Sequence, residues 1–235
     1  PEPEVLLSYI LRELAHEKDM KGLKVCVTAG PTRETIDPVR FISNRSTGKM
    51  GFALAKNAME RGADVTLVSG PVELKDVPFV KMVHVESARQ MFEAVTKEAE
   101  TADIIVKAAA VADYRPAVVA DEKIKKKDGD MSIALERKDD IIGTLGKTKR
   151  DNLFLCGFSM ETEHMLENSK AKLEKKNLDM IIANNVKVKG AGFGTDTNVV
   201  TLITKDEIKE LPIMSKEDVA DEIFNNILAN RKGIV

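Results

Sequence analysis

A segment rich in small, hydroxyl and basic residues, from 28 to 49, carries the first chemistry that this sequence suggests. It ends at Ser46, Thr47, Gly48 and Lys49, directly before an apolar pattern of helical spacing. The N–H groups and positive dipole end of a helix favour anions, and two hydroxyls and an ammonium group add to that preference. The segment therefore suits a phosphate-binding turn, although a long loop that ends in an ordinary Ser or Thr helix cap fits the same residues.

The turn departs from two known nucleotide-binding motifs. A P-loop has a glycine five residues before its Gly-Lys pair and a Ser or Thr after it, but Gly48 lacks the first and Met50 replaces the second. No Gly-x-Gly-x-x-Gly pattern follows Val27, and neither Tyr9 nor Tyr114 has a lysine four residues later. A nicotinamide-dependent reductase therefore stays open only as a weaker alternative.

Two further segments could contact a nucleotide. Residues 108–112 form a row of small residues that leads to Asp113, whose carboxylate could accept from a ribose hydroxyl or help to hold a cation. Packing beneath a helix would explain the same row. The run 123–127 includes Lys123 and Lys126. Such a run is usually a solvated surface, but its place after the small residues also fits a lid that brings cations to a triphosphate.

Other kinds of site have less support. Residues 157–162 and 183–185 follow apolar runs and could line a ligand or only form turns. The three histidines are dispersed, which disfavours a zinc site, and no Gly-x-Ser-x-Gly turn presents a nucleophile. The residues alone predict a nucleotide-binding enzyme that uses phosphate chemistry, with a non-catalytic nucleotide-binding domain as a further alternative.

Apolar runs alternate with amphipathic segments along most of the chain, which predicts an α/β fold with a Rossmann-like, doubly wound and mainly parallel sheet. We expect strands at 23–29, 63–68, 81–85, 103–109, 152–158 and 179–183, an antiparallel pair at 198–204 and 207–213, and helices at 50–61, 87–99, 163–176 and from Ser215 onward. Ligands of such sheets bind at the carboxyl ends of the strands, where the polar segments gather. Residues 111–140 interrupt the alternation and predict a flap or small β insertion, with a turn at 128–129 and a strand at 131–135.

Composition bounds the remaining possibilities. We expect a linker-like segment at 1–20, with an amphipathic pattern at 5–18, and one nucleotide-binding domain at 21–235. The net charge is −2, from 36 Lys and Arg against 38 Asp and Glu, which argues against a nucleic-acid surface. No apolar stretch has the length of a membrane span, and Cys26 and Cys156 lie in strand-like runs rather than a disulfide framework. These features predict a soluble, cytoplasmic protein.

Taken together, these segments resemble the phosphopantothenoylcysteine synthetase family, the phosphopantothenate–cysteine ligases of coenzyme A biosynthesis in their bacterial and archaeal form. The matching motifs occupy 28–34, 37–40, 42–51, 109–114 and 123–126, with further matches at 157–162, 183–184 and 192–198. In this form the family usually makes up the C-terminal half of a bifunctional protein whose N-terminal half is a flavin decarboxylase. The resemblance, with a proline at position 1, therefore implies a longer parent protein and no flavin in this domain.

The resemblance implies a two-step ligation. The carboxylate of 4′-phosphopantothenate attacks the α-phosphate of CTP, which is bound with Mg²⁺, and pyrophosphate leaves. The amine of L-cysteine then attacks the acyl-cytidylate, giving phosphopantothenoylcysteine and CMP. Positioning and charge neutralisation would supply most of the catalysis. The family's active site lies at a dimer interface, so the resemblance also implies a homodimer.

The family's motifs assign roles by position. The catalytic positions match Asn44, which holds the acyl-nucleotidylate for the second step, Arg40 on the same intermediate, and Lys123, a flap lysine of the first step. Ala110 joins Asn44 and Arg40 in binding the intermediate, while the residues that would bind the nucleotide are Gly30, Ser46, Thr47, Gly48, Lys49, Ala109, Asp113, Lys123, Lys126 and Phe158. No protein ligand for the metal is assigned. This sequence departs from the family pattern at three places. Thr47 stands where many relatives have Ser, and residues 138–140 replace an Asn-Pro-Asp or similar turn that lies beside the base. Met160 stands where a smaller residue is common, which narrows the pocket.

Overall fold

The computed structural model describes residues 2–126, 130–138, 140–160, 164–184, 192 and 194–231. Its helices are α1 (Pro3–Leu14), α2 (Lys49–Glu60), α3 (Ala88–Ala99), α4 (Ile141–Lys147), α5 (Met165–Lys175) and α6 (Lys216–Asn230). Its strands are β1 (Lys24–Ala29), β2 (Arg33–Thr35), β3 (Phe41–Ser43), β4 (Asp64–Ser69), β5 (Lys81–His84), β6 (Ile104–Lys107), β7 (Tyr114–Pro116), β8 (Leu135–Arg137), β9 (Phe154–Met160), β10 (Met180–Asn184), β11 (Thr197–Asn198), β12 (Val200–Thr204), β13 (Ile208–Glu210) and β14 (Met214–Ser215).

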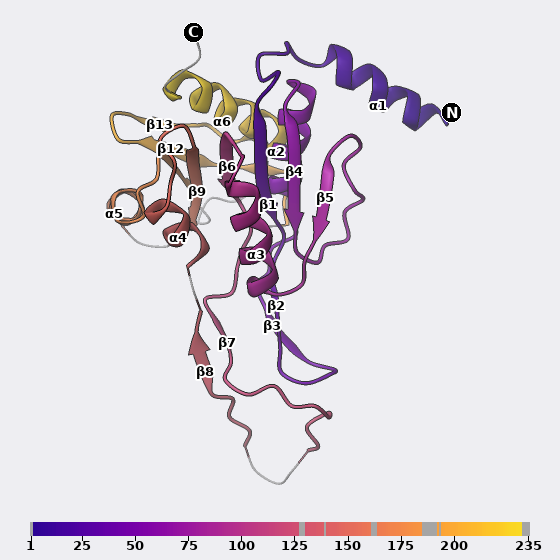
Figure 1. Ribbon diagram of the computed structural model, residues 1–235, viewed down its shortest axis with the longest axis vertical. Helices are drawn as coiled ribbons and strands as arrows, with labels where there is room; N and C mark the ends of the chain where they lie inside the picture. Colours follow the sequence, from indigo (N-terminus) through magenta and orange to yellow (C-terminus); the bar gives the residue numbers. More distant parts are fainter. Residues whose placement is uncertain are drawn as a thin grey trace.

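One sheet of eight strands organises the molecule, in the order β13-β12-β10-β9-β6-β1-β4-β5. Neighbours from β10 to β5 are parallel, and β12 and β13 add an antiparallel edge. The predicted Rossmann-like, mainly parallel sheet is therefore confirmed. The chain runs from β1 to β4 and β5 and later returns to β6 on the other side of β1 (Figure 1). Ligands of doubly wound sheets bind where the connections diverge in this way, here at the carboxyl ends of β1 and β6.

Helices cover both faces of the sheet, and each face has its own aliphatic core (Figure 1). On one face α2 and α6 bury Leu54 and Phe224, and on the other α3, α4 and α5 lie over Ile105. Cys26 and Cys156 are both buried free thiols, but they belong to different cores. Burial raises the pKa of Cys26 to about 12, so this thiol is unreactive.

The ends of the helices follow their sequence signals. Ser87 and Gln90 form the predicted capping box of α3, and the Ser215 side chain caps α6 by accepting from the Asp218 N–H at 3.0 Å. Gly62 follows α2 in the left-handed region, with φ of 92°. These three signals are all local in the sequence, which explains why they predict the helix boundaries well.

The described part of residues 111–140, called the insertion below, extends away from the sheet, and β7 pairs there with β8 (Figure 1). The predicted strand at 131–135 is wrong in position, because pairing starts only at Leu135, opposite Pro116. Part of the segment expected as one long loop, 28–49, forms the antiparallel hairpin β2–β3. Helix α4 has no counterpart among the predicted elements.

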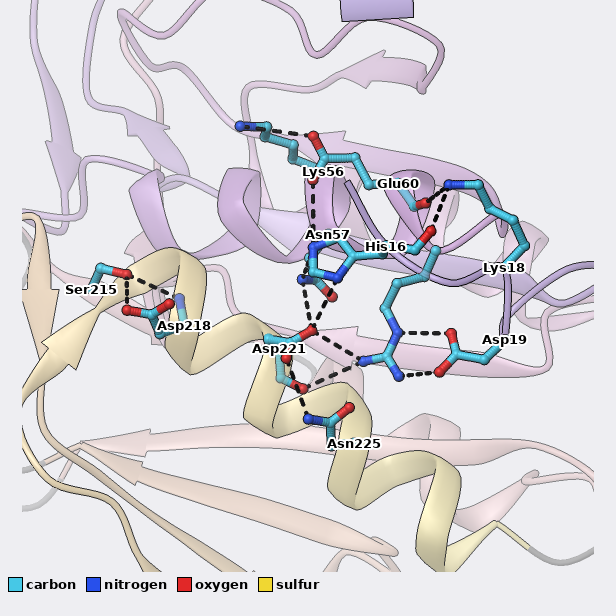
Figure 2. A network of polar contacts seen from close by, with 11 residues as sticks. His16, Lys18, Asp19, Lys56, Asn57, Glu60, Ser215, Asp218, Asp221 and Asn225 are labelled. Carbon is cyan, nitrogen blue, oxygen red and sulfur yellow. Dashed lines mark hydrogen bonds and ion pairs between the residues drawn. The ribbon is translucent and has the colours of Figure 1, made fainter. Parts of the chain in front are cut away.

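The chain before β1 is fixed to α2 and α6 by polar contacts (Figure 2). Arg61, which is 5% exposed, pairs with Asp19 and with Asp221. His16 lies 3.6 Å from an Asp221 oxygen and 3.8 Å from a Glu60 oxygen. Helix α1 ends at Leu14, earlier than the pattern at 5–18 predicts, and none of its residues is buried. Among the described residues, no helix combines the length and apolarity that a membrane crossing needs.

Candidate phosphate and nucleotide site

The predicted phosphate turn lies at the start of α2. Gly48 occupies the N-cap position in the left-handed region, with φ of 81°, and no side chain caps the helix there. The ordinary Ser or Thr cap that the sequence also allowed is therefore not the cap that forms. Gly51 lies so close to β1 that a Cβ on it would be 2.5 Å from Ala29 Cβ and 2.8 Å from the Thr28 carbonyl oxygen. This close approach sets the first turn of α2 directly against the end of β1.

A pocket opens at this turn, called the α2 pocket below. It is lined by Ser46, Thr47, Gly48, Lys49, Met50, Gly51, Ala108, Phe158, Met160, Asn184, Gly192, Asn198 and Lys216. The structure thus brings the turn 46–49 together with Phe158, and it places Met160 in the lining. Asn184 accepts a hydrogen bond from the Asn198 side chain at 2.9 Å, which joins the ends of β10 and β11 at the pocket.

Two lysines, Lys49 and Lys216, line the α2 pocket, and Asp196 lies beside it as the partner of Lys49. Lys49 donates to the Asp196 carboxylate at 2.6 Å and to the Gly194 carbonyl at 3.2 Å. Lys216 is only 4% exposed and donates to backbone carbonyls, including Gly192 at 3.1 Å. Burial lowers the pKa of Lys216, and the neighbouring Lys49 charge lowers it further. Lys216 was not among the predicted site residues. The one signal for it in the sequence is a lysine in the first turn of a helix, where the dipole favours acidic residues.

A second group of predicted residues lies where β1 and β6 diverge. The Ala110 N–H donates to the Gly30 carbonyl at 3.0 Å, and the Ala109 N–H donates to the Thr28 hydroxyl at 3.1 Å. The Asn44 side chain donates to the Ala110 carbonyl at 2.9 Å. Gly30 has φ of 74° and approaches the backbone of the segment after β4. The alanine row is therefore fixed by hydrogen bonds to β1 and to the segment that follows it.

Arg40 joins the β2–β3 hairpin to the insertion. Its guanidinium donates to Asp37, which is 1% exposed, and to the Ile124 carbonyl at 2.9 Å. Asp37 in turn accepts from the Ile124 N–H at 3.1 Å. The hydrogen bond from Arg40 holds the pKa of Asp37 well below its usual range, despite the opposing effect of burial. Arg40 and Asp37 therefore hold the backbone of Ile124, the residue next to Lys123 in the insertion.

The structure places some of the predicted residues in a second cavity, away from the α2 pocket. Arg40, Lys123 and Lys126 line an open cavity of the insertion together with Ile124, Lys125, Asp130, Met131 and Ser132. This cavity, called the insertion cavity below, has no lining residue in common with the α2 pocket. Lys123 and Lys126 are exposed, as is Asp113 at the start of the insertion. In the described residues of this chain, the insertion lysines and the turn 46–49 therefore do not line a common cavity, as a lid over a triphosphate would require.

A cationic cluster that was not predicted lies at the end of β6, on the face covered by α4 and α5. Burial lowers the pKa of Lys107, and the charge of Lys176 lowers it further. Asp140 caps α4 by accepting from the Gly143 N–H at 3.2 Å and pairs with Lys176 at 2.8 Å. Burial alone would raise the pKa of Asp140, but the Lys176 ammonium group and other cations keep it below its ordinary value. These lysines are far apart in the sequence, so only the fold brings them together.

Several expectations fall outside the described residues. They concern Lys127, the turn at 128–129, Asp139, residues 161–162, Asn185 and Phe193. Within the described ranges, no group of three or more His, Cys, Asp or Glu side chains could hold a metal ion.

Known proteins resemble this chain in sequence and in fold. A family model described as the C-terminal domain of DNA/pantothenate metabolism flavoproteins matches residues 20–230. The coenzyme A biosynthesis bifunctional protein CoaBC of Bacillus subtilis (strain 168) is 49% identical over 236 residues, which cover 98% of this chain and 58% of that protein. The chain thus spans little more than half the length of this relative.

Solved structures agree with the sequence comparison. The crystal structure of the C-terminal domain of a coenzyme A biosynthesis bifunctional protein CoaBC matches with a TM-score of 0.76 and 44% identity, over 88% of this chain and 95% of that chain. A Cab2 mutant in complex with phosphopantothenate-cysteine matches with a TM-score of 0.73 over 98% and 95% of the two chains. At 16% identity, the second match shows likeness of fold alone.

Proposed function

Because the chain belongs to the family of DNA/pantothenate metabolism flavoprotein C-terminal domains, we propose that it is a CTP-dependent phosphopantothenate–cysteine ligase of coenzyme A biosynthesis. The observation that carries this proposal is its 49% identity, over 98% of the chain, to a protein named for coenzyme A biosynthesis. The site geometry supports it, because phosphate-binding features gather at the carboxyl ends of the parallel strands. The ligase corresponds to one part of a bifunctional relative, and we assign the flavin chemistry to the other part.

In the first step, a carboxylate oxygen of 4′-phosphopantothenate bonds to the α-phosphorus of CTP, and the bond to pyrophosphate breaks. Both reactants are anions, so the protein's main task is to neutralise charge and hold the two groups in line. Lys49, Lys216 and the uncapped N–H donors at the start of α2 offer one set of groups that favour anions. Lys123, Lys126 and the cluster around Lys107 offer two more.

In the second step, the amine of L-cysteine bonds to the acyl carbon, CMP leaves, and the amine loses its proton. We propose that Asn44 orients the acyl-cytidylate for this attack, with Arg40 on the same intermediate. The hydrogen bond from Asn44 to the Ala110 carbonyl supports this role, because it sets the side chain against the alanine row. Small side chains at 108–112 leave room for a ligand beside this row.

Magnesium enters this proposal with the nucleotide. The described residues offer no group of three or more acidic, histidine or cysteine ligands, which does not fit a resident metal ion. Mg²⁺ commonly binds proteins through one or two carboxylates and substrate phosphates. The Mg²⁺–CTP complex is therefore the substrate of the first step.

We further propose a homodimer in which the insertion of one subunit completes the site of the other. Two observations support this. The insertion cavity and the α2 pocket have no common lining residue, although the ligase needs both sets of cations. The β2–β3 hairpin and the insertion also project from the sheet (Figure 1) and expose large apolar side chains, among them Phe41, Tyr114 and Val118 at 47%, 52% and 82%. Exposed apolar groups of this kind are typical of subunit interfaces.

Pyrophosphate release tests the proposed function. The protein is incubated with 4′-phosphopantothenate and Mg²⁺ and with either CTP or ATP, in the presence and absence of L-cysteine. Release with CTP that requires phosphopantothenate, followed by amide formation only with cysteine, is the expected result. Light scattering measures the oligomeric state of the same sample. A folded dimer that binds CTP and releases no pyrophosphate would instead be a non-catalytic nucleotide-binding domain.

A further inference from the structure

The Lys49–Asp196 pair joins the start of α2 to a segment 147 residues away. Lys49 is about one-third exposed, and the Asp196 side chain is 88% exposed. An ion pair this open to water contributes little to stability, so it exchanges readily for another partner of the same charge. Asp196 therefore lies where a ligand anion could replace it.

Lys216 holds the same segment from its buried side. It donates to the carbonyls of Gly192 and Thr195, which both precede Asp196 in the chain. Lys216 lies between Ser215 and Asp218 in the first turn of α6. Two hydrogen bonds between Ser215 and Asp218 hold this turn in place (Figure 2). Lys216 therefore stays in the α2 pocket whatever ion Lys49 binds.

Two carboxylates lie near the lysines of the α2 pocket, because Glu217 acts on Lys216 as Asp196 does. Neither carboxylate is among the described residues that line the pocket, whereas both lysines are. The Asp196 charge acts on Lys49 and Lys216 together, and the positive end of the α2 dipole adds to these two cations. A phosphate monoester carries close to two negative charges near neutral pH and offers three acceptor oxygens. It therefore suits two ammonium groups and a row of N–H donors better than a carboxylate does.

We propose that Asp196 is an internal counter-ion of the α2 pocket: its carboxylate pairs with Lys49 in the ligand-free protein and gives way to a phosphate group of the substrate, while Lys216 remains as the second cation. Asp196 is thus a specificity-determining residue, because only a ligand with more charge than its carboxylate displaces it. The inference rests on the proposed function for the identity of the substrate but not for the exchange itself. Two sources of the phosphate fit this chemistry, the monoester of phosphopantothenate and the triphosphate of CTP.

Isothermal titration with inorganic phosphate at constant ionic strength tests the exchange without any need for turnover. In Asp196→Asn the competing carboxylate is gone, so the affinity for phosphate is expected to rise about tenfold. Asp206→Asn is the matched control, since it changes the net charge equally in an exposed turn between β12 and β13. Its phosphate affinity is expected to stay within about twofold, because charges beyond a Debye length are screened.

A double-mutant cycle isolates the role of Lys49. Lys49→Met is expected to weaken phosphate binding, and adding Asp196→Asn to it should bring no further gain, since the two residues act on one another. Asp196→Ala is expected to behave like Asp196→Asn, and circular dichroism verifies the fold of each variant. An unchanged or weakened phosphate affinity in both Asp196 variants would overturn the proposal and leave the pair as a structural tie.

Titrations with 4′-phosphopantothenate and with CTP then identify the source of the phosphate. The ligand that binds more tightly to Asp196→Asn than to the parent protein supplies the group that replaces the carboxylate. If neither ligand gains affinity, the proposed exchange is wrong for the substrate. Failure of pyrophosphate release in the earlier assay, with the phosphate response intact, would count against the ligase function and not against the exchange.

Discussion

The Arg40 guanidinium lies against the Asp37 carboxylate, with Arg40 Nε 2.9 Å from Asp37 Oδ2, and the two side chains together hold the backbone of Ile124. Asp37 also accepts from the N–H groups of Val39 and Arg40 at 2.9 Å. One nearly buried carboxylate thus organises both the turn between β2 and β3 and the start of the lysine run in the insertion.

This arrangement predicts how stability depends on acid. Arg40 keeps the pKa of Asp37 below its value in the unfolded chain, which is near 3.9. A carboxylate with a depressed pKa stabilises the fold above the unfolded value, and that contribution is lost as the pH falls through the folded value. At pH 6 the free energy of unfolding of Asp37→Asn should therefore be lower than that of the parent protein. Below about pH 4 the difference between the two proteins should become steadily smaller.

Urea denaturation from pH 6 to pH 2.5 measures this difference. Asp37→Asn keeps an acceptor oxygen and the size of the side chain, so packing changes little. A difference that stays constant over this pH range would mean that Asp37 acts through its shape and not through its charge.

Asn44→Asp is expected to separate the two proposed steps. The amide of Asn44 donates to the Ala110 carbonyl, whereas a carboxylate cannot donate and would repel that oxygen. Amide formation should fall about a hundredfold, as when one positioned donor is removed from an active site. Pyrophosphate release should stay within about threefold of the parent rate, because the first step does not need this donor. Rapid-quench assays of both products test this, and an equal loss in both steps would contradict the role.

Lys123→Ala should suppress pyrophosphate release itself, because this lysine is proposed to meet the triphosphate in the first step. We expect a loss of about a hundredfold in kcat. Lys125→Ala is the matched control: it lies in the same run, lines the same cavity and is similarly exposed, but carries no proposed role. Equal rates for the two variants would refute the assignment of Lys123.

Gly51→Ala should lower stability by about 1–3 kcal/mol, the usual effect of overpacking. The added Cβ would lie 2.5 Å from Ala29 Cβ and 2.8 Å from the Thr28 carbonyl, so helix and strand would have to separate. Gly194→Ala is the control, since a Cβ there meets nothing within 4 Å. Thermal denaturation compares the two variants. Equal midpoints would mean that α2 can shift away from β1 without loss of stability.

Prediction from the sequence succeeds where the signal is local. The strands of the sheet and the capped ends of α3 and α6 follow from runs of apolar residues and from Ser87 and Ser215. Helix α4 gives a weak signal, because it has only seven residues and two of them, Gly143 and Gly146, have low helix propensity. The strands β2, β3 and β8 have three residues each, too few for a period-two pattern to stand out.

The site could be predicted only in part. The turn 46–49 is contiguous, so its helix-start chemistry is visible in the sequence, and the structure joins it to Phe158. Lys216 and Lys107 could not be found in the same way, since each becomes part of a charged cluster only through strands and helices from distant parts of the chain. Their chemistry depends on burial, which follows from the fold and not from the neighbouring residues.

The wide sequence separation of Lys49 and Asp196 also constrains how the protein matures. Contacts between distant residues form late, because a long loop must close before they contribute. During translation at about 5–20 residues per second, the turn 46–49 leaves the ribosome many seconds before α6. The nascent chain thus contains the turn 46–49 well before Lys216 of α6 has been synthesised. Phosphate binding during synthesis would then report that the last helix has docked onto the sheet.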